Sequence, residues 1–118
     1  MILTKKGANY FGEESIDADG KKHRHMAVVR GQGVLTLRED ALHFEQWLTK
    51  KVYHIPISQI THVTTSRSHN GKFNLFHVLQ VHYMNEAQEH RIFGIQVGWK
   101  KDVLQWKTEI ESLVANKD

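Results

Sequence analysis

The hydrophobic period of this chain changes once, at Gly98. Before Gly98, apolar residues alternate with polar ones over short runs, which is typical of β-strands. After it, apolar residues recur at helical spacing and predict one amphipathic helix over residues 99–115. Its apolar stripe consists of Trp99, Val103, Trp106, Ile110 and Leu113. A stripe with two tryptophans must cover apolar surface, and the open end or seam of a β layer is the natural place.

The alternating runs predict about seven short strands joined by polar turns. The expected strands are 13–17 at an edge, 34–37, 42–47, 52–57, 60–67, 73–83 and 89–97, with 25–30 as a short strand or a helical turn. Residues 1–12 have no clear period and contain Gly7 and Gly12, so a loosely ordered arm is expected there. We expect Leu35, Leu37, Phe44, Ile57, Leu79, Val81, Phe93 and Ile95 in the core.

Length and composition predict a single domain over residues 1–118. The chain has no cysteine, which excludes disulfides and thiolate chemistry. Its N-terminus lacks the apolar stretch of a signal peptide, and no segment approaches the ~20 apolar residues that span a bilayer. A cytoplasmic location is therefore the default expectation. The formal net charge of +3 is mild, and it suits either anionic partners or simple solubility.

The order of these segments resembles the pleckstrin-homology-like (PH-like) superfamily, and within it the GRAM and bacterial PH-like groups. The resemblance covers residues 12–115 and rests on a hairpin over 30–44, the segment Ile55-Pro56-Ile57-Ser58-Gln59-Ile60, a strand pair over 78–95 and the terminal helix. It implies a bent seven-stranded antiparallel barrel or sandwich, capped by one C-terminal helix. The superfamily is known for binding phosphoinositides, peptides or proteins.

The same resemblance implies that three loops meet at the end opposite the helix. Together these loops would bring five cations to one rim: Lys21, Lys22, Arg24, Lys50 and Lys51. Such a cluster can hold a phosphorylated headgroup. The lipid-binding pattern of the family, however, has basic residues in the first strand, where this chain has Glu13 and Glu14. The alternative is that the loop lysines are simply solvated.

Enzymatic chemistry has little support in the sequence. No serine lies in a G-x-S-x-G context, there is no phosphate-binding loop, and the acidic pairs are adjacent, so their side chains would point to opposite faces. Nine histidines are present, but their spacing matches no metal site, although His82 and His90 could be neighbours across the last hairpin. We expect no cofactor, metal or small-molecule substrate. The strand aromatics Phe73, Phe76 and Tyr83 fit a core better than a nucleic-acid surface.

The sequence thus predicts a non-enzymatic binding or assembly module that contacts another protein or a second copy of itself. Residues 60–67 are rich in β-branched residues and nearly uncharged, so as an edge strand they would recruit a partner strand. The alternative is that neighbouring segments already cover this strand. A second function is also open: a peripheral membrane module that binds anionic phospholipid through the basic rim.

Overall fold

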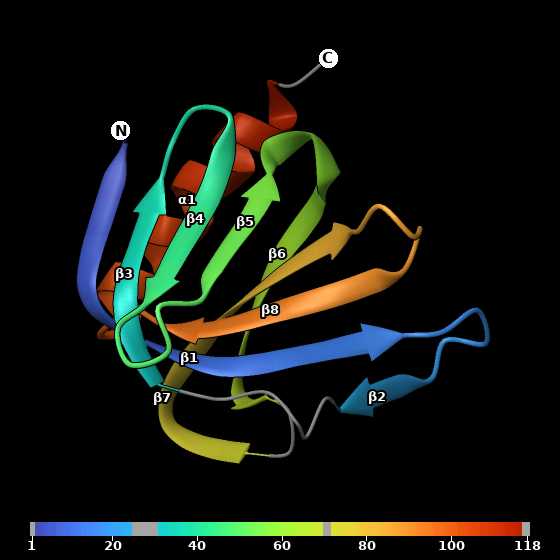
Figure 1. Cartoon of the computed structure of the whole chain (residues 1–118), viewed down its shortest axis with the longest axis horizontal. Helices are drawn as coiled ribbons and strands as arrows, with labels where there is room; N and C mark the ends of the chain where they lie inside the picture. The colour runs from blue at the N-terminus through green and yellow to red at the C-terminus, as the bar shows by residue number, and fades with distance from the viewer. Residues whose placement is uncertain (1, 25–30, 70–71, 117–118) are drawn as a thin grey trace.

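The computed structural model of the chain describes the backbone of residues 2–24, 31–69 and 72–116, and the same side chains apart from residues 24, 68, 69 and 72–76. Within these residues, eight antiparallel strands and one long helix follow one another (Figure 1). They are β1 (Leu3–Ile16), β2 (Lys22–Arg24), β3 (Gly31–Leu37), β4 (Ala41–Gln46), β5 (Val52–Pro56), the 3-10 turn η1 (Ile57–Gln59), β6 (Ile60–His69), β7 (Lys72–Met84), β8 (His90–Gln96) and α1 (Lys100–Ala115). The predicted strand at 25–30 lies outside the described residues.

The strands form one open, bent sheet in the order β5-β4-β3-β1-β8-β7-β6, and β2 pairs with β1 beside this path. The helix packs against β6, β7 and η1. The predicted fold class, a bent antiparallel sheet followed by a C-terminal helix, is therefore confirmed. Pro56 ends β5, where it interrupts no central ladder.

The first strand produces the bend. Its N-terminal half pairs with β3, and its C-terminal half pairs with β8 and β2. The register slips at Gly7 against β3 and beside Gly12 against β8, and both glycines have positive φ angles of 81° and 92°. Such irregularities add local twist and turn the strand sharply. The predictions of a loose arm over 1–12 and an edge strand over 13–17 are wrong, because the glycines bend a central strand instead of interrupting it.

The concave face of the sheet holds the main core. All eight core residues expected from the alternation are buried, together with Tyr10 from β1. The helix contributes Val103, Trp106 and Ile110 to the same cluster, and Leu113 packs against it. The prediction for Trp99 is wrong, since its side chain is 69% exposed. Trp99 has an extended backbone at the N-cap position, so it does not lie on the helical stripe, and its N–H donates to the Asp102 carboxylate at 3.1 Å.

The other face of the sheet is also partly buried. Val78 and Leu79 are adjacent on β7 and both inaccessible, although their side chains point to opposite faces. Phe11 and Ile92 are likewise buried outside the main core cluster. This two-sided burial explains why the alternation breaks near residue 78. It also creates a sheltered second face, where His82 lies.

Candidate functional site

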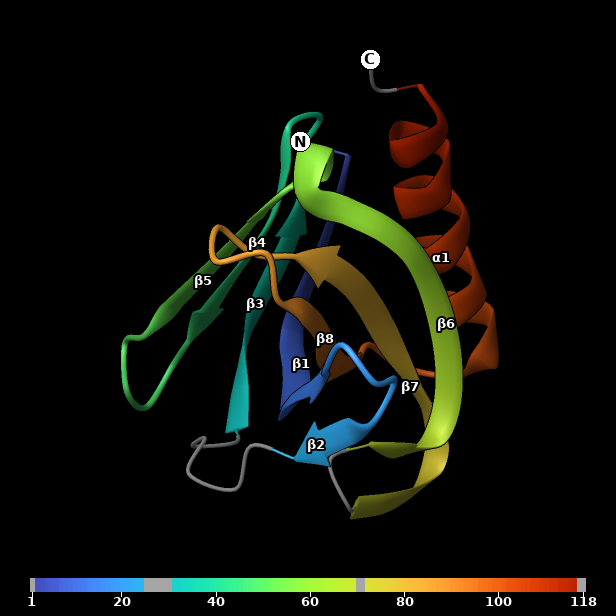
Figure 2. The ribbon, with the colours of Figure 1, turned by 90° about the vertical axis from the view of Figure 1, so that its right-hand side faces the viewer.

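The predicted basic rim does not form as one site. Lys21 and Lys22 lie at the β1–β2 turn, whereas Lys50 and Lys51 lie at the β4–β5 turn. These two turns are on opposite sides of the molecule in Figure 1, and they are also well separated in Figure 2. The bend in β1 carries the β1–β2 turn away from the β4–β5 turn. For Arg24, the backbone pairs with Glu14, and its side chain lies outside the described residues.

Two of these lysines also have partners within the chain. Lys22 Nζ lies 3.7 Å from Glu14 Oε1, and Lys51 Nζ lies 5.1 Å from the centre of the Tyr53 ring. The first contact is an ion pair with a buried carboxylate, and the second is a cation–π contact. The ion pair therefore holds the Lys22 side chain against β1, and the cation–π contact holds the Lys51 side chain over the Tyr53 ring.

A cleft of about 600 Å³ separates the β1–β2 turn from the β7–β8 turn. Its ionisable lining residues are Asp17, His23, Glu89 and His90. His23 Nε2 lies 2.7 Å from Asp17 Oδ2, and this hydrogen bond, with a second from the Lys21 N–H, lowers the pKa of Asp17. Two carboxylates and two histidines are a poor match for a phosphorylated headgroup at neutral pH.

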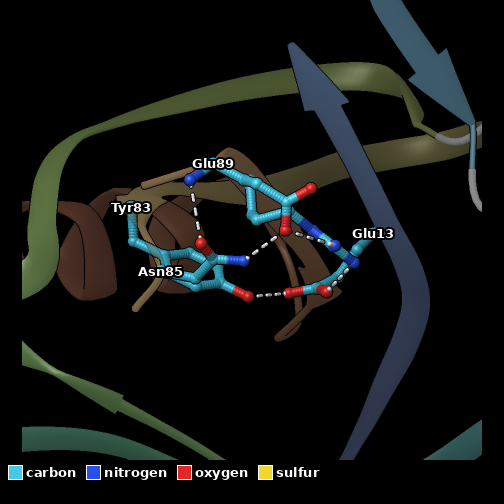
Figure 3. Close-up of polar contacts among 5 residues, drawn as sticks. Glu13, Tyr83, Asn85 and Glu89 are labelled. Atoms are coloured by element: carbon cyan, nitrogen blue, oxygen red, sulfur yellow. Dashed lines mark hydrogen bonds and ion pairs between the residues drawn. The ribbon is translucent and has the colours of Figure 1, made fainter. Parts of the chain in front are cut away.

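A partly buried polar network lies on the concave face, where β1, β7 and β8 meet (Figure 3). Tyr83 Oη donates to Glu13 Oε2, and Arg91 Nη2 donates to Glu13 Oε1 at 2.8 Å. Asn85 and Glu89 close the β7–β8 turn through two 2.9 Å hydrogen bonds, and Glu89 also lies 3.9 Å from Arg91. Both Glu13 oxygens are therefore engaged, so this carboxylate ties three strands together and is not a free general base.

Tyr83 and Tyr10 are held in the neutral form. Burial raises the pKa of Tyr83, and the Glu13 carboxylate raises it further. Burial also raises the pKa of Tyr10, whose ring lies 4.6 Å from that of Tyr53. Arg91 Nε is buried and makes no hydrogen bond within the described part of the chain. The Tyr10 and Tyr53 rings pack against each other and against Phe44 and Phe93, so an aromatic cluster lies beside the polar network.

Three histidines gather on the sheltered second face. His62 on β6 stacks on His82 of β7 at 4.0 Å between ring centres, and His82 Nδ1 lies 3.0 Å from His90 Nε2 on β8. The predicted proximity of His82 and His90 is confirmed. His82 Nε2 also contacts the Thr64 hydroxyl at 2.9 Å. Among the residues whose placement is described, no group of three or more histidine or acidic side chains is arranged to hold a metal ion.

The histidine cluster predicts a loss of stability in mild acid. The pKa of His90 is lowered from its usual 6.5 by burial and by the charge of His62. A histidine with a lower pKa in the folded state binds fewer protons there than in the unfolded chain. The free energy of unfolding is therefore highest above pH 6.5 and falls as the pH drops below that value. Urea unfolding at about pH 8 and about pH 5 should show this decrease. His90→Gln should make the decrease smaller, and the same pH dependence in His90→Gln and in wild type would contradict the prediction.

A small hollow of about 40 Å³ lies where the helix meets β6 and β7, and its lining residues are Thr65, His77, Lys100, Val103 and Leu104. We call it the groove beside β6. Leu104 is 48% exposed there, and Trp99 is exposed at the start of the same helix. Apolar side chains beside an edge strand are features that a bound segment could cover.

Sequence reasoning missed the Glu13–Arg91 pair and the exposed tryptophan at the start of α1. In the sequence, Tyr83 alternates with Val81 and Leu79, and Arg91 alternates with Phe93 and Ile95, and the structure pairs Tyr83 directly with Arg91 across the two strands. That pairing was the available signal for a buried polar site. The contribution of Glu13 depends on the register of β1 against β8, which no local pattern specifies.

Within the part of the chain that the structure describes, no helix is long and apolar enough to cross a membrane. A scan against protein-family models found no match, and a search of curated proteins found no match either.

Proposed function

We propose that the protein is a non-enzymatic binding module of the PH-like superfamily that accepts an extended polypeptide segment along β6. The observation that carries the proposal is the place of β6 at the end of the sheet, where its only strand partner among the described residues is β7. An edge strand can pair its outward backbone groups with another chain. At ten residues, β6 is twice as long as β5, the strand at the other end of the path, which has five.

The groove beside β6 supports the same function. An added strand would lie next to α1, and Leu104 could then pack against an apolar side chain of the incoming segment. The hollow beside Leu104 is small and is bordered by Lys100, so it suits one short side chain or an acidic one. A second copy of this chain and a different protein are both possible sources of the segment, and the state of assembly distinguishes them.

The groove is best tested through Leu104, because Val63 on β6 is buried in the core and its replacement would disturb folding. If wild-type protein self-associates, Leu104→Arg should weaken the association at least about tenfold, since it places a charge in an apolar contact. Leu48→Arg is the matched control, because Leu48 is exposed in the β4–β5 turn, and this turn and α1 lie on opposite sides of the sheet in Figure 2. Sedimentation velocity over a wide concentration range measures both.

Hydrogen exchange gives a second and independent readout. On binding, the outward amides of Thr61–Thr65 should become protected, while those of β5 should not change. If self-association occurs without protection of β6, or if Leu104→Arg and Leu48→Arg weaken it equally, the proposed site is wrong. A monomer whose β6 amides already exchange slowly would contradict the proposal altogether, because no edge would then be available.

A further inference from the structure

The β4–β5 turn gathers three of the large apolar side chains that are exposed in the described part of the chain. Leu48 is 87% exposed, Val52 47% and Trp47 44%. Lys50 and Lys51 lie between them, and the turn residues 47–51 include no carboxylate. Glu45 is the nearest acidic residue in the sequence, and it lies on β4 opposite Val52, one step back from the turn. We call residues 47–52 the β4–β5 tip.

The tip is held in one conformation by its own hydrogen bonds. The Gln46 N–H donates to the Lys51 carbonyl at 2.9 Å, and the Trp47 N–H donates to the Gln32 carbonyl of β3 at 3.0 Å. The Thr49 hydroxyl donates to Gln46 Oε1 at 2.9 Å and accepts from the Lys51 N–H at 3.1 Å. The exposure of Trp47 and Leu48 is therefore a property of an ordered turn, and little conformational entropy would be lost when the tip contacts a partner.

We propose that the β4–β5 tip docks on a bilayer that contains anionic lipid, with Trp47 and Leu48 inserted at the interface. Tryptophan favours the membrane–water boundary, and leucine favours the acyl chains below it. Lysines beside such residues extend along the apolar surface and keep their ammonium groups near lipid phosphates. A turn of this size offers much less than the ~800 Å² that each partner buries in a stable protein interface, which favours a membrane over a protein.

This mode of binding differs from the predicted basic rim. A rim site would need both the β1–β2 and the β4–β5 lysines, whereas tip insertion needs only the latter. Lys21 and Lys50 therefore form a matched pair, because each is an exposed lysine in a turn and the two turns lie on opposite sides of the molecule (Figure 1). The groove beside β6 lies elsewhere, so the tip and the groove can be tested separately.

The test is cosedimentation of the full chain with phosphatidylcholine vesicles, with and without phosphatidylserine, at low salt. Wild type should bind only the vesicles that contain phosphatidylserine. Leu48→Ser should weaken binding about tenfold or more. Lys50→Glu should weaken it about twenty-fivefold, since the substitution changes the charge by two units and each unit near the surface is worth about fivefold. Lys21→Glu and Leu104→Ser should bind like wild type. Brominated lipid should quench the fluorescence of wild type more than that of Trp47→Phe.

Several results would overturn the proposal. One is no binding of wild type at low salt, and another is equal loss of binding in Lys21→Glu and Lys50→Glu, which indicates a shared rim. Unchanged binding of Leu48→Ser would exclude insertion, and circular dichroism establishes that this variant is folded. Binding to phosphoinositide vesicles but not to phosphatidylserine vesicles would indicate headgroup recognition instead. Loss of self-association in Leu48→Ser, with no binding to vesicles, would assign the tip to a protein partner.

Discussion

Replacing Trp106 with alanine is expected to lower the free energy of unfolding by about 3–5 kcal/mol. The Trp106 side chain is only 4% exposed and belongs to the cluster that joins α1 to the sheet. Its removal forfeits the burial of a large ring and leaves a cavity that the rigid strands cannot fully close. Urea or thermal unfolding followed by circular dichroism measures the loss.

Trp99 provides the matched control within the same helix. Its side chain is 69% exposed at the N-cap, so Trp99→Ala should change the free energy of unfolding by less than about 1 kcal/mol. The contrast between two tryptophans seven residues apart tests whether the helix lies on the sheet as described. Similar losses in both variants would show that the orientation of the helix is wrong.

Replacing Glu13 with alanine is expected to cost about 3–5 kcal/mol as well. The carboxylate accepts hydrogen bonds from Arg91 and Tyr83, and the substitution would leave a largely buried guanidinium and a phenol without their acceptor. The loss should exceed the cost of the missing side-chain contacts, because the desolvated charge of Arg91 remains. Chemical denaturation of wild type and Glu13→Ala at neutral pH measures the difference in the free energy of unfolding.

Two further variants isolate the ion pair. Glu86→Ala, in the exposed β7–β8 turn, should be nearly neutral. Adding Arg91→Leu to Glu13→Ala should recover part of the stability, because the unpaired charge is then removed. The contrary result is additivity, in which the double variant loses as much free energy of unfolding as the two single variants together. Glu13 and Arg91 would then act independently.

Local patterns were sufficient to predict most of the sheet and the helix. Leu35, Leu37 and Phe44 follow strict alternation, and the structure buries all three. The N-terminal strand could not be predicted in the same way, because glycines such as Gly7 and Gly12 occur both in loops and in bulged strands. The choice depends on whether β3 and β8 are available as partners, which is a property of the whole fold.

The candidate sites also differ in whether local sequence or the topology of the whole fold determines their contacts. The contact between His82 and His90 could be predicted because a short turn joins their strands and nearly fixes the register. The Glu13–Arg91 pair joins residues 78 positions apart, so it depends on topology. The expectation that all the loop lysines lie at one end failed for a similar reason. The bend in β1 determines where the β1–β2 turn lies, and the sequence of that turn carries no information about the bend.

The double role of β1 also has a consequence for synthesis on the ribosome. Its C-terminal half needs β8, and Ile16 pairs with His90, so this edge emerges long before its long-range partner. Such non-local pairing slows folding and leaves a nascent strand open to wrong association. The short β2 follows almost immediately and pairs with Glu14, Ser15 and Ile16 on the other edge of the strand. During translation, pairing with β2 therefore covers one edge of the C-terminal half of β1, and only the edge that later pairs with β8 stays open.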